Sequence, residues 1–198
     1  ARKIVIGGKM FYPNWISKTP LHLAERTREI YPRRTRTGSF ILYWMRQAQR
    51  AHDNPALDVA IEAANIHRMP LLVYHELLEK GWHHNARKHR FIIEGAAELH
   101  ESLREKGIAY IFHVETRFNK GSHVRKLCSM ANLMVTEDYP VPQFKNLEKL
   151  SMELHLPVYL VDTNCVVPMQ FSTKKYTSLK EFIDVTNHWR ESRTTASW

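Results

Sequence analysis

From Phe40 onward, short apolar runs alternate with amphipathic segments. The run at 40–45 is almost entirely apolar, which is typical of a strand buried on both faces of a parallel sheet. The following residues show helical spacing, and Pro55 suits a first helical turn with Asp53 or Asn54 as its N-cap. This alternation predicts strands at 40–45, 71–75, 108–113, 133–136 and 157–161, and helices at 55–67, 86–106, 122–131, 142–155 and 178–190.

The pattern predicts an α/β fold: a doubly wound, five-stranded parallel sheet, Rossmann-like, with helices on both faces. Each parallel pair of strands needs a crossover helix, and the predicted connections are short. The longest helix carries an apolar stripe of Phe91, Ile92, Gly95, Leu99 and Leu103. Gly107 is expected to end that helix in the left-handed conformation.

The chain divides into three parts. Residues 1–39 form an N-terminal basic arm with the run Arg33-Arg34-Thr35-Arg36, 40–170 form the α/β domain, and 171–198 form a further segment that contains a helix. No internal repeat or low-complexity segment stands out.

Composition adds a basic charge and two cysteines. The net charge of +9 suggests an anionic partner such as nucleic acid, although a solvated basic surface explains it equally well. Two cysteines outside a CxxC pattern indicate reduced thiols in a cytoplasmic or nuclear protein. No apolar run is long enough for a membrane span, so we expect no membrane partner. The basic clusters, as DNA-contact candidates, are Arg33, Arg34, Arg36, Arg87, Lys88 and Arg90.

Known chemical motifs are missing from the sequence. There is no GxGxxG after the first strand, no P-loop, no close set of metal ligands and no GxSxG elbow. The residues therefore predict neither a catalytic constellation nor a metal site in this chain.

Ligands of doubly wound sheets bind outside the carboxyl ends of the strands. Among the aromatic residues there, Tyr43 and Tyr74 are expected to be core residues, whereas Trp44 and Tyr139 are the better candidates to stack on a planar ring. The predicted cofactor-binding residues are Trp44, Met45, Arg50, Asp53, Asn54, His75, Glu76, Asp138 and Tyr139.

Four ordered segments resemble the DNA photolyase and cryptochrome family, in particular its class II branch. Residues 43–57 are similar to that branch's Tyr-Trp-Met, Arg-Asp-Gln-Arg and Asp-Asn-x-Ala-Leu signature, with Gln47 and Ala48 in place of Arg and Asp. The segments 87–95, 135–140 and 160–168 resemble later family motifs in the right order. With alanine at 48, Arg50 must find a partner other than an aspartate there, and Asp53 is the nearest candidate.

The resemblance implies a division of labour. The family's N-terminal α/β domain holds an antenna chromophore such as a deazaflavin or a folate. FAD and damaged DNA are bound by a helical C-terminal domain, which we do not expect within these residues. Residues 171–198 then correspond to the start of the interdomain linker, and this chain alone is not expected to repair DNA.

Two other functions are compatible with the same residues. One is a nucleotide-binding α/β module of another family, because the fold does not fix the function. The other is a non-catalytic, photolyase-like interaction protein that has kept the fold and lost the site, which the Gln47-Ala48 departure would fit.

Overall fold

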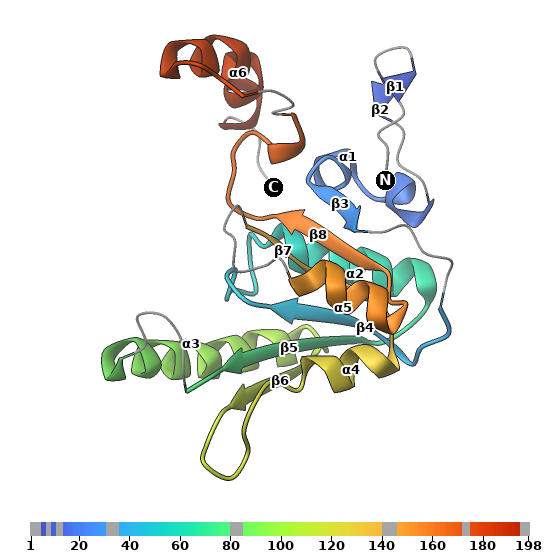
Figure 1. Cartoon of the computed structure of the whole chain (residues 1–198), viewed down its shortest axis with the longest axis vertical. Helices are drawn as coiled ribbons and strands as arrows, with labels where there is room; N and C mark the ends of the chain where they lie inside the picture. The colour runs from blue at the N-terminus through green and yellow to red at the C-terminus, as the bar shows by residue number, and fades with distance from the viewer. Residues whose placement is uncertain are drawn as a thin grey trace.

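The computed structural model of the protein describes residues 5–6, 9–10, 14–30, 36–79, 85–139, 146–171 and 175–194 (Figure 1). The strands are β1 (Val5–Ile6), β2 (Lys9–Met10), β3 (Thr27–Ile30), β4 (Phe40–Met45), β5 (Leu71–Leu77), β6 (Ala109–Val114), β7 (Ala131–Asp138) and β8 (Val158–Asp162). The helices are η1 (Asn14–Lys18), α1 (Leu21–Ala24), α2 (Pro55–His67), α3 (Ala86–Glu105), α4 (Val124–Met130), α5 (Asn146–Leu154), η3 (Met169–Phe171) and α6 (Leu179–Thr194).

The main sheet has six strands in the order β3-β8-β7-β4-β5-β6. The five predicted strands, β4 to β8, are all present and parallel. The predicted strand count was nevertheless wrong, because β3 adds an antiparallel edge strand in which Thr27 pairs with Val161 and Ile30 with Val158. This sixth strand comes from the segment that the sequence analysis assigned to the basic arm.

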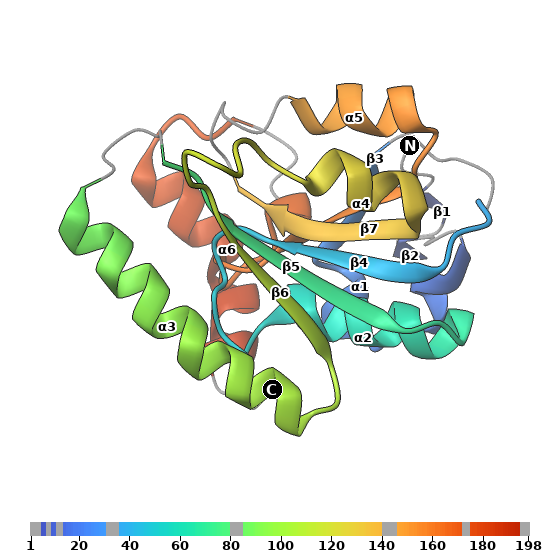
Figure 2. The same cartoon turned by 90° about the horizontal axis from the view of Figure 1, so that it is seen from below.

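Helices cover both faces of the sheet, as predicted (Figure 2). On one face, α2 and α3 pack over Ile41, Tyr43 and Val73, while α4 and α5 pack over Leu42 and Met134 on the other. Neighbouring residues of β4 thus enter opposite cores, as the period-2 alternation of a strand requires. This explains why a run with almost no polar residue forms the central strand.

Local signals fix the ends of the two best-predicted helices. Asn54 caps α2, with its Oδ1 accepting hydrogen bonds from the backbone N–H of Ala56 and Leu57 at 3.1 Å each. Gly107 follows α3 with a φ of +69°, the left-handed conformation expected of it.

The apolar stripe of α3 is only half covered. Leu99 and Leu103 are buried, but Phe91, at the other end of the stripe, is 76% exposed. The beginning of α3 projects beyond the sheet (Figure 2), and Phe91 there faces an open pocket whose other side is the loop 47–51. Which residues of the stripe are buried therefore depends on how far the sheet extends beneath α3, and helical periodicity carries no information about that.

None of the helices in the described part of the chain is long and apolar enough to span a membrane.

Candidate functional site

The strand order places a topological switch point between β4 and β7. From β4 the chain moves outward through β5 to β6, then returns to pair β7 with the opposite side of β4. Crossovers leave such a pair of strands in opposite directions, which opens a crevice at their carboxyl ends. The residues that follow β4 and end β7 therefore determine what the crevice contains.

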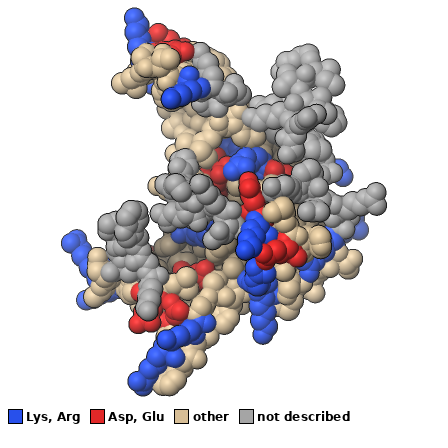
Figure 3. Space-filling model, in the orientation of Figure 1, with Lys and Arg blue, Asp and Glu red and all other residues tan. Residues whose placement is uncertain are grey.

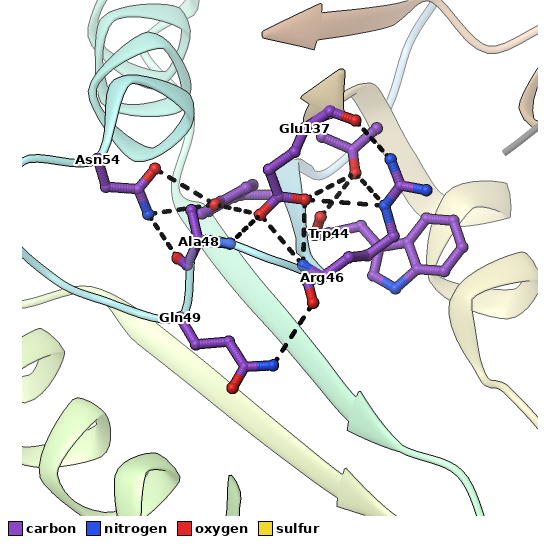
Figure 4. A network of polar contacts seen from close by, with 8 residues as sticks. Trp44, Arg46, Ala48, Gln49, Asn54 and Glu137 are labelled. Atoms are coloured by element: carbon purple, nitrogen blue, oxygen red, sulfur yellow. Dashed lines mark hydrogen bonds and ion pairs between the residues drawn. The ribbon is translucent and has the colours of Figure 1, made fainter. Parts of the chain in front are cut away.

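A buried carboxylate fills this crevice (Figure 4). Glu137, at 1% exposure, accepts hydrogen bonds from the Tyr43 hydroxyl at 2.8 Å and from the backbone N–H of Arg46 at 3.1 Å. The backbone N–H of Ala48 also points at its Oε1, at 3.3 Å. Burial, followed by the Glu137 charge, raises the pKa of Tyr43 well above its ordinary value, so the hydroxyl keeps its proton and donates it. The strand-end acid thus organises the loop after β4.

Arg46 closes the same crevice with its side chain. Its Nε donates to the Thr136 hydroxyl at 2.9 Å, and its Nη2 donates to the Glu137 carbonyl at 2.6 Å. The guanidinium also lies 5.0 Å from the ring centroid of Trp44, within cation–π distance. Trp44, a predicted stacking residue, is therefore in contact with a guanidinium of its own chain (Figure 4).

Asn54 holds the other end of the loop. It is 1% exposed, and its Nδ2 donates to the carbonyls of Ala48 at 2.9 Å and Arg50 at 3.0 Å. The Asn54 side chain therefore both caps α2 and holds the backbone of the loop between β4 and α2 at two positions. This accounts structurally for the Asp-Asn-x-Ala-Leu motif.

The loop so held presents Arg50 and Asp53 to a cleft of about 430 Å³. Nε of Arg50 donates to the carbonyl oxygen of Asp53 at 3.0 Å, so Asp53 is the partner predicted for Arg50, although through its backbone. Asp53 itself has a φ of +48°, a left-handed conformation that Asp and Asn tolerate better than most residues. The cleft is lined by His22, Glu25, Arg26, Arg50, Asp53, Pro55, Thr163, Asn164, Cys165, Val166, Arg193 and Thr194.

Arg26 and an ion pair between Arg193 and Glu25 form the far wall of the cleft. Arg26 donates to the carbonyl oxygens of Cys165 at 2.6 Å and Val166 at 3.2 Å. Burial lowers its pKa, and the charges of Asp162 and Glu25 oppose that shift. Arg193 of α6 forms an ion pair with Glu25, which joins the last described helix to the N-terminal segment.

Thr163 supplies the one buried hydroxyl of the cleft that lacks a partner in the described residues. It is 8% exposed and follows β8 directly, and its Oγ1 meets no hydrogen-bond partner there. A buried hydroxyl without a partner costs free energy unless a ligand or a water molecule satisfies it. Thr163 therefore marks the position in the cleft where a polar ligand atom would be most favourable.

Only two of the predicted cofactor-binding residues, Arg50 and Asp53, line this cleft. Met45 is fully buried in the core, because the residue that ends β4 points under α2 and α3. Asp138 forms a salt bridge with Arg28 of β3 at 2.5 Å. Tyr139 is 37% exposed and does not line the cleft.

His75 and Glu76 point to opposite faces of β5. His75 is 1% exposed, with Nδ1 2.8 Å from the Tyr110 hydroxyl, and burial lowers its pKa to about 4. Glu76 accepts a hydrogen bond from the Tyr74 hydroxyl at 2.8 Å. Tyr43 and Tyr74 are core residues, as predicted.

The DNA-contact candidates are also separated. Arg33 and Arg34 lie outside the described residues. Arg36 donates to the carbonyls of Ser129 and Leu154, which lie in the last turns of α4 and α5. Arg87, Lys88 and Arg90 are exposed in the first turns of α3, where Arg90 pairs with Glu94 at 2.7 Å.

Sequence reasoning missed the cleft residues that come from outside the predicted domain. Glu25 and Arg26 precede β3, and Arg193 lies in the last turn of α6. A mixed, charged segment such as 25–30 gives no local strand signal, so only the pairing with β8 brings these residues to the site.

The family model and the curated relatives agree on one family. The DNA photolyase family model matches residues 41–197. A deoxyribodipyrimidine photo-lyase of Methanothermobacter thermautotrophicus is 34% identical over 139 residues, which cover 70% of this chain and 31% of that protein. The Arabidopsis thaliana deoxyribodipyrimidine photo-lyase is 25% identical over 138 residues, covering 68% of this chain and 28% of that protein. The chain thus spans less than a third of the length of these relatives.

Among solved structures, a universal stress protein from Archaeoglobus fulgidus has a TM-score of 0.41 and 15% identity, covering 62% of this chain and 98% of that one.

Proposed function

The chain belongs to the DNA photolyase family, and from this premise we propose that it is the N-terminal α/β module of a class II-like deoxyribodipyrimidine photolyase. The complete protein would use light and FAD to repair cyclobutane pyrimidine dimers in damaged DNA. FAD would be held by a helical domain, in cis or in trans, and this module would not be catalytic alone. We place the protein in the cytoplasm or the nucleus.

We further propose that the module holds an antenna chromophore, a deazaflavin or a folate, in the cleft beside Arg50. The single observation that carries this proposal is the cleft itself, at the carboxyl edge of the sheet and lined by Arg50, Asp53 and Thr163. Its volume of about 430 Å³ is within the range of small-molecule sites. When bound, such a chromophore supplies the absorption of light and passes the excitation on.

The residues present fit the polar part of such a molecule. The Thr163 hydroxyl has no partner in the described residues, and the terminal nitrogens of Arg50 have none there either. Both chromophore classes carry hydroxyl or carboxylate groups that a hydroxyl and a guanidinium would bind. Pro55 and Val166 supply apolar surface in the same cleft.

The buried network gives this arrangement its rigidity. Glu137 holds the backbone N–H of Arg46, and Asn54 holds the carbonyl of Arg50. The Arg50 side chain therefore extends from a loop that is fixed at both ends, which reduces the ordering cost of binding. In the proposed function these buried residues position the site without touching the chromophore.

The direct test is absorbance and fluorescence titration of the purified chain with a deazaflavin and with a reduced folate. Thr163→Val keeps the shape of the side chain and removes only the hydroxyl, so we expect weaker chromophore binding without loss of stability. Arg50→Gln should weaken binding further, whereas Arg28→Gln, on the surface beside Asp138, should leave it unchanged. Uptake of neither chromophore, together with tight binding of AMP or ATP, would instead establish a nucleotide-binding module.

A further inference from the structure

Two phenylalanines at the carboxyl edge of the sheet are almost fully exposed. Phe118 is 84% exposed and Phe91 is 76% exposed, more than any other large hydrophobic residue in the described part of the chain. Phe118 lies in the loop after β6, and Phe91 lies in the second turn of α3, which follows β5. Since β5 and β6 are neighbouring parallel strands, both rings belong to one edge of the molecule.

The loop that carries Phe118 is held firmly. Thr116 and Asn119 form an antiparallel bridge, with backbone hydrogen bonds of 3.1 and 3.2 Å around the turn. The carboxylate of Glu115 accepts the backbone N–H of Gly121 at 2.8 Å and of Glu79 at 2.7 Å. The Phe118 ring is thus held in an exposed position by an ordered, hydrogen-bonded turn.

Cations flank both rings. The Arg117 guanidinium lies 4.5 Å from the Phe118 centroid, and Lys120 follows in the same loop. Arg87 and Lys88 are exposed one turn before Phe91, and neither has a salt bridge within the described residues. Figure 3 shows basic side chains along the projecting loop at the lower end of the molecule, which is the loop after β6 in Figure 1.

The basic residues at the beginning of α3 oppose its dipole. Arg87, Lys88 and Arg90 lie in the first turns, and the first turn contains no acid. Helix stability favours acids at the N-terminus and bases at the C-terminus, and only Arg104 in the last turn follows that order. Stability of the helix therefore does not explain why the basic residues gather beside Phe91.

We propose that this edge binds a nucleic-acid strand, in which Arg117, Lys120, Arg87 and Lys88 contact phosphates and Phe118 stacks on an exposed base. These four cations, with Phe91 and Phe118, are called the basic rim. The proposal rests on the proposed function, because it adds a contact of this module with the DNA on which the complete protein would act.

The chemistry of the rim favours nucleic acid over the other anionic surfaces. Single strands are bound by cations that follow the backbone together with aromatic rings that stack on bases. A membrane-binding surface would need a continuous apolar face beside its cations, and here the two rings are carried on separate elements.

The test is binding of the whole chain to a fluorescent oligothymidylate of about 16 nucleotides, measured by anisotropy over a range of salt concentrations. Each phosphate contact on a single strand contributes about 0.7 to the slope of log K against log salt. We therefore expect Arg117→Gln/Lys120→Gln and Arg87→Gln/Lys88→Gln each to lower the slope by about 1.4. The matched control is Arg68→Gln/Lys106→Gln, because these exposed residues follow α2 and α3 at the opposite edge of the sheet.

Phe118 distinguishes stacking from general attraction. Phe118→Leu keeps an apolar side chain but removes the ring, so the affinity should fall about tenfold with the slope unchanged, and Phe118→Trp should restore it. At 84% exposure, the ring contributes little to the fold, and these variants should unfold like the parent.

Three results would overturn the proposal: no oligonucleotide binding at low salt, an equal effect of the control pair, or binding to anionic phospholipid vesicles that depends on the same residues. Chromophore titration of the same samples separates the two proposals. Normal uptake with no oligonucleotide binding refutes only the basic rim, whereas rim-dependent oligonucleotide binding without uptake refutes only the antenna site.

Discussion

Replacing Glu137 by glutamine tests whether a buried carboxylate builds the site. The carboxylate accepts hydrogen bonds from the Tyr43 hydroxyl and from the backbone N–H of Arg46 and Ala48. It also lies 3.7 Å from Nε of Arg46, whose side chain is 9% exposed. A glutamine retains one oxygen and puts an NH₂ donor where a second acceptor was. If the NH₂ group takes the Oε1 position, the Tyr43 hydroxyl and the Ala48 N–H lose their acceptor. If it takes the Oε2 position, the three donors keep an oxygen that is no longer charged, and the NH₂ group faces the Arg46 guanidinium.

The magnitude follows from these contacts. A hydrogen bond to a charged acceptor contributes about 1.5–3 kcal/mol and one to a neutral acceptor about 0.5–1.5 kcal/mol, so the three bonds to Glu137 lose about 3 kcal/mol together even where every donor keeps an oxygen. We therefore expect Glu137→Gln to lower the free energy of unfolding by about 3 kcal/mol. For a chain of this size that corresponds to a fall in Tm of about 6–12 °C. The same change should weaken chromophore binding, because the loop that carries Arg50 loses its anchor.

The assay is urea unfolding followed by circular dichroism, with hydrogen exchange of the Arg46 and Ala48 amides as the local measurement. Asp138→Asn is the matched control, because that neighbouring carboxylate pairs with Arg28, whose side chain is 45% exposed. Exposed pairs contribute about 1 kcal/mol or less. If Glu137→Gln and Asp138→Asn lower the free energy of unfolding equally, Glu137 is not the anchor of the loop. The same conclusion follows if the Arg46 and Ala48 amides stay protected from hydrogen exchange in Glu137→Gln.

Three further predictions concern groups away from the cleft or beneath it. Asn54→Asp keeps the cap acceptor of α2 but loses the Nδ2 donor to the carbonyls of Ala48 and Arg50. We expect the free energy of unfolding in urea to fall by about 2 kcal/mol, and a fall below about 0.5 kcal/mol would show that these two hydrogen bonds do not hold the loop. Arg36→Met removes two hydrogen bonds to carbonyls in the last turns of α4 and α5 and should lower the free energy of unfolding by about 2 kcal/mol. Arg36→Lys should have a stability between those of the parent and Arg36→Met. Equal stability of all three proteins would show that these helix ends do not depend on the Arg36 side chain. Burial lowers the pKa of His75 to about 4, so the folded state binds the proton less readily than the unfolded state, in which the pKa is about 6.5. The free energy of unfolding is therefore highest above about pH 6.5 and decreases as the pH falls towards 4, because only the unfolded state takes up the proton in that range. In His75→Gln, the loss of unfolding free energy between pH 6.5 and 4 should be smaller by about 3 kcal/mol, and parallel pH profiles of the two proteins would refute this assignment.

Local sequence signals sufficed where a segment's structure depends on its own residues. The limits of α2, its Asn54 cap and the left-handed Gly107 follow from capping chemistry. The double burial of β4 follows from its unbroken apolar run. These features need no knowledge of distant contacts.

The remaining features depend on tertiary pairing. Strand β3 has the sequence Thr-Arg-Glu-Ile, whose charges suit an edge strand but do not identify one, and only β8 fixes it. Glu137 follows the strand predicted at 133–136, and nothing nearby in the sequence shows that it is buried, because the N–H group of Arg46 that it binds lies 91 residues earlier. The exposure of Phe91 depends on where the sheet ends beneath α3, which helical periodicity does not encode.

The antiparallel strand β3 has a consequence for how this domain is to be produced. A gene shortened to begin at Phe40, where the regular alternation starts, would leave one side of β8 without its neighbour. The sequence Val-Tyr-Leu-Val-Asp would then offer unpaired backbone groups to other molecules, and such apolar edges favour polymerisation. The same deletion would remove Glu25 and Arg26, so the shortened protein would combine insolubility with a cleft that lacks one wall.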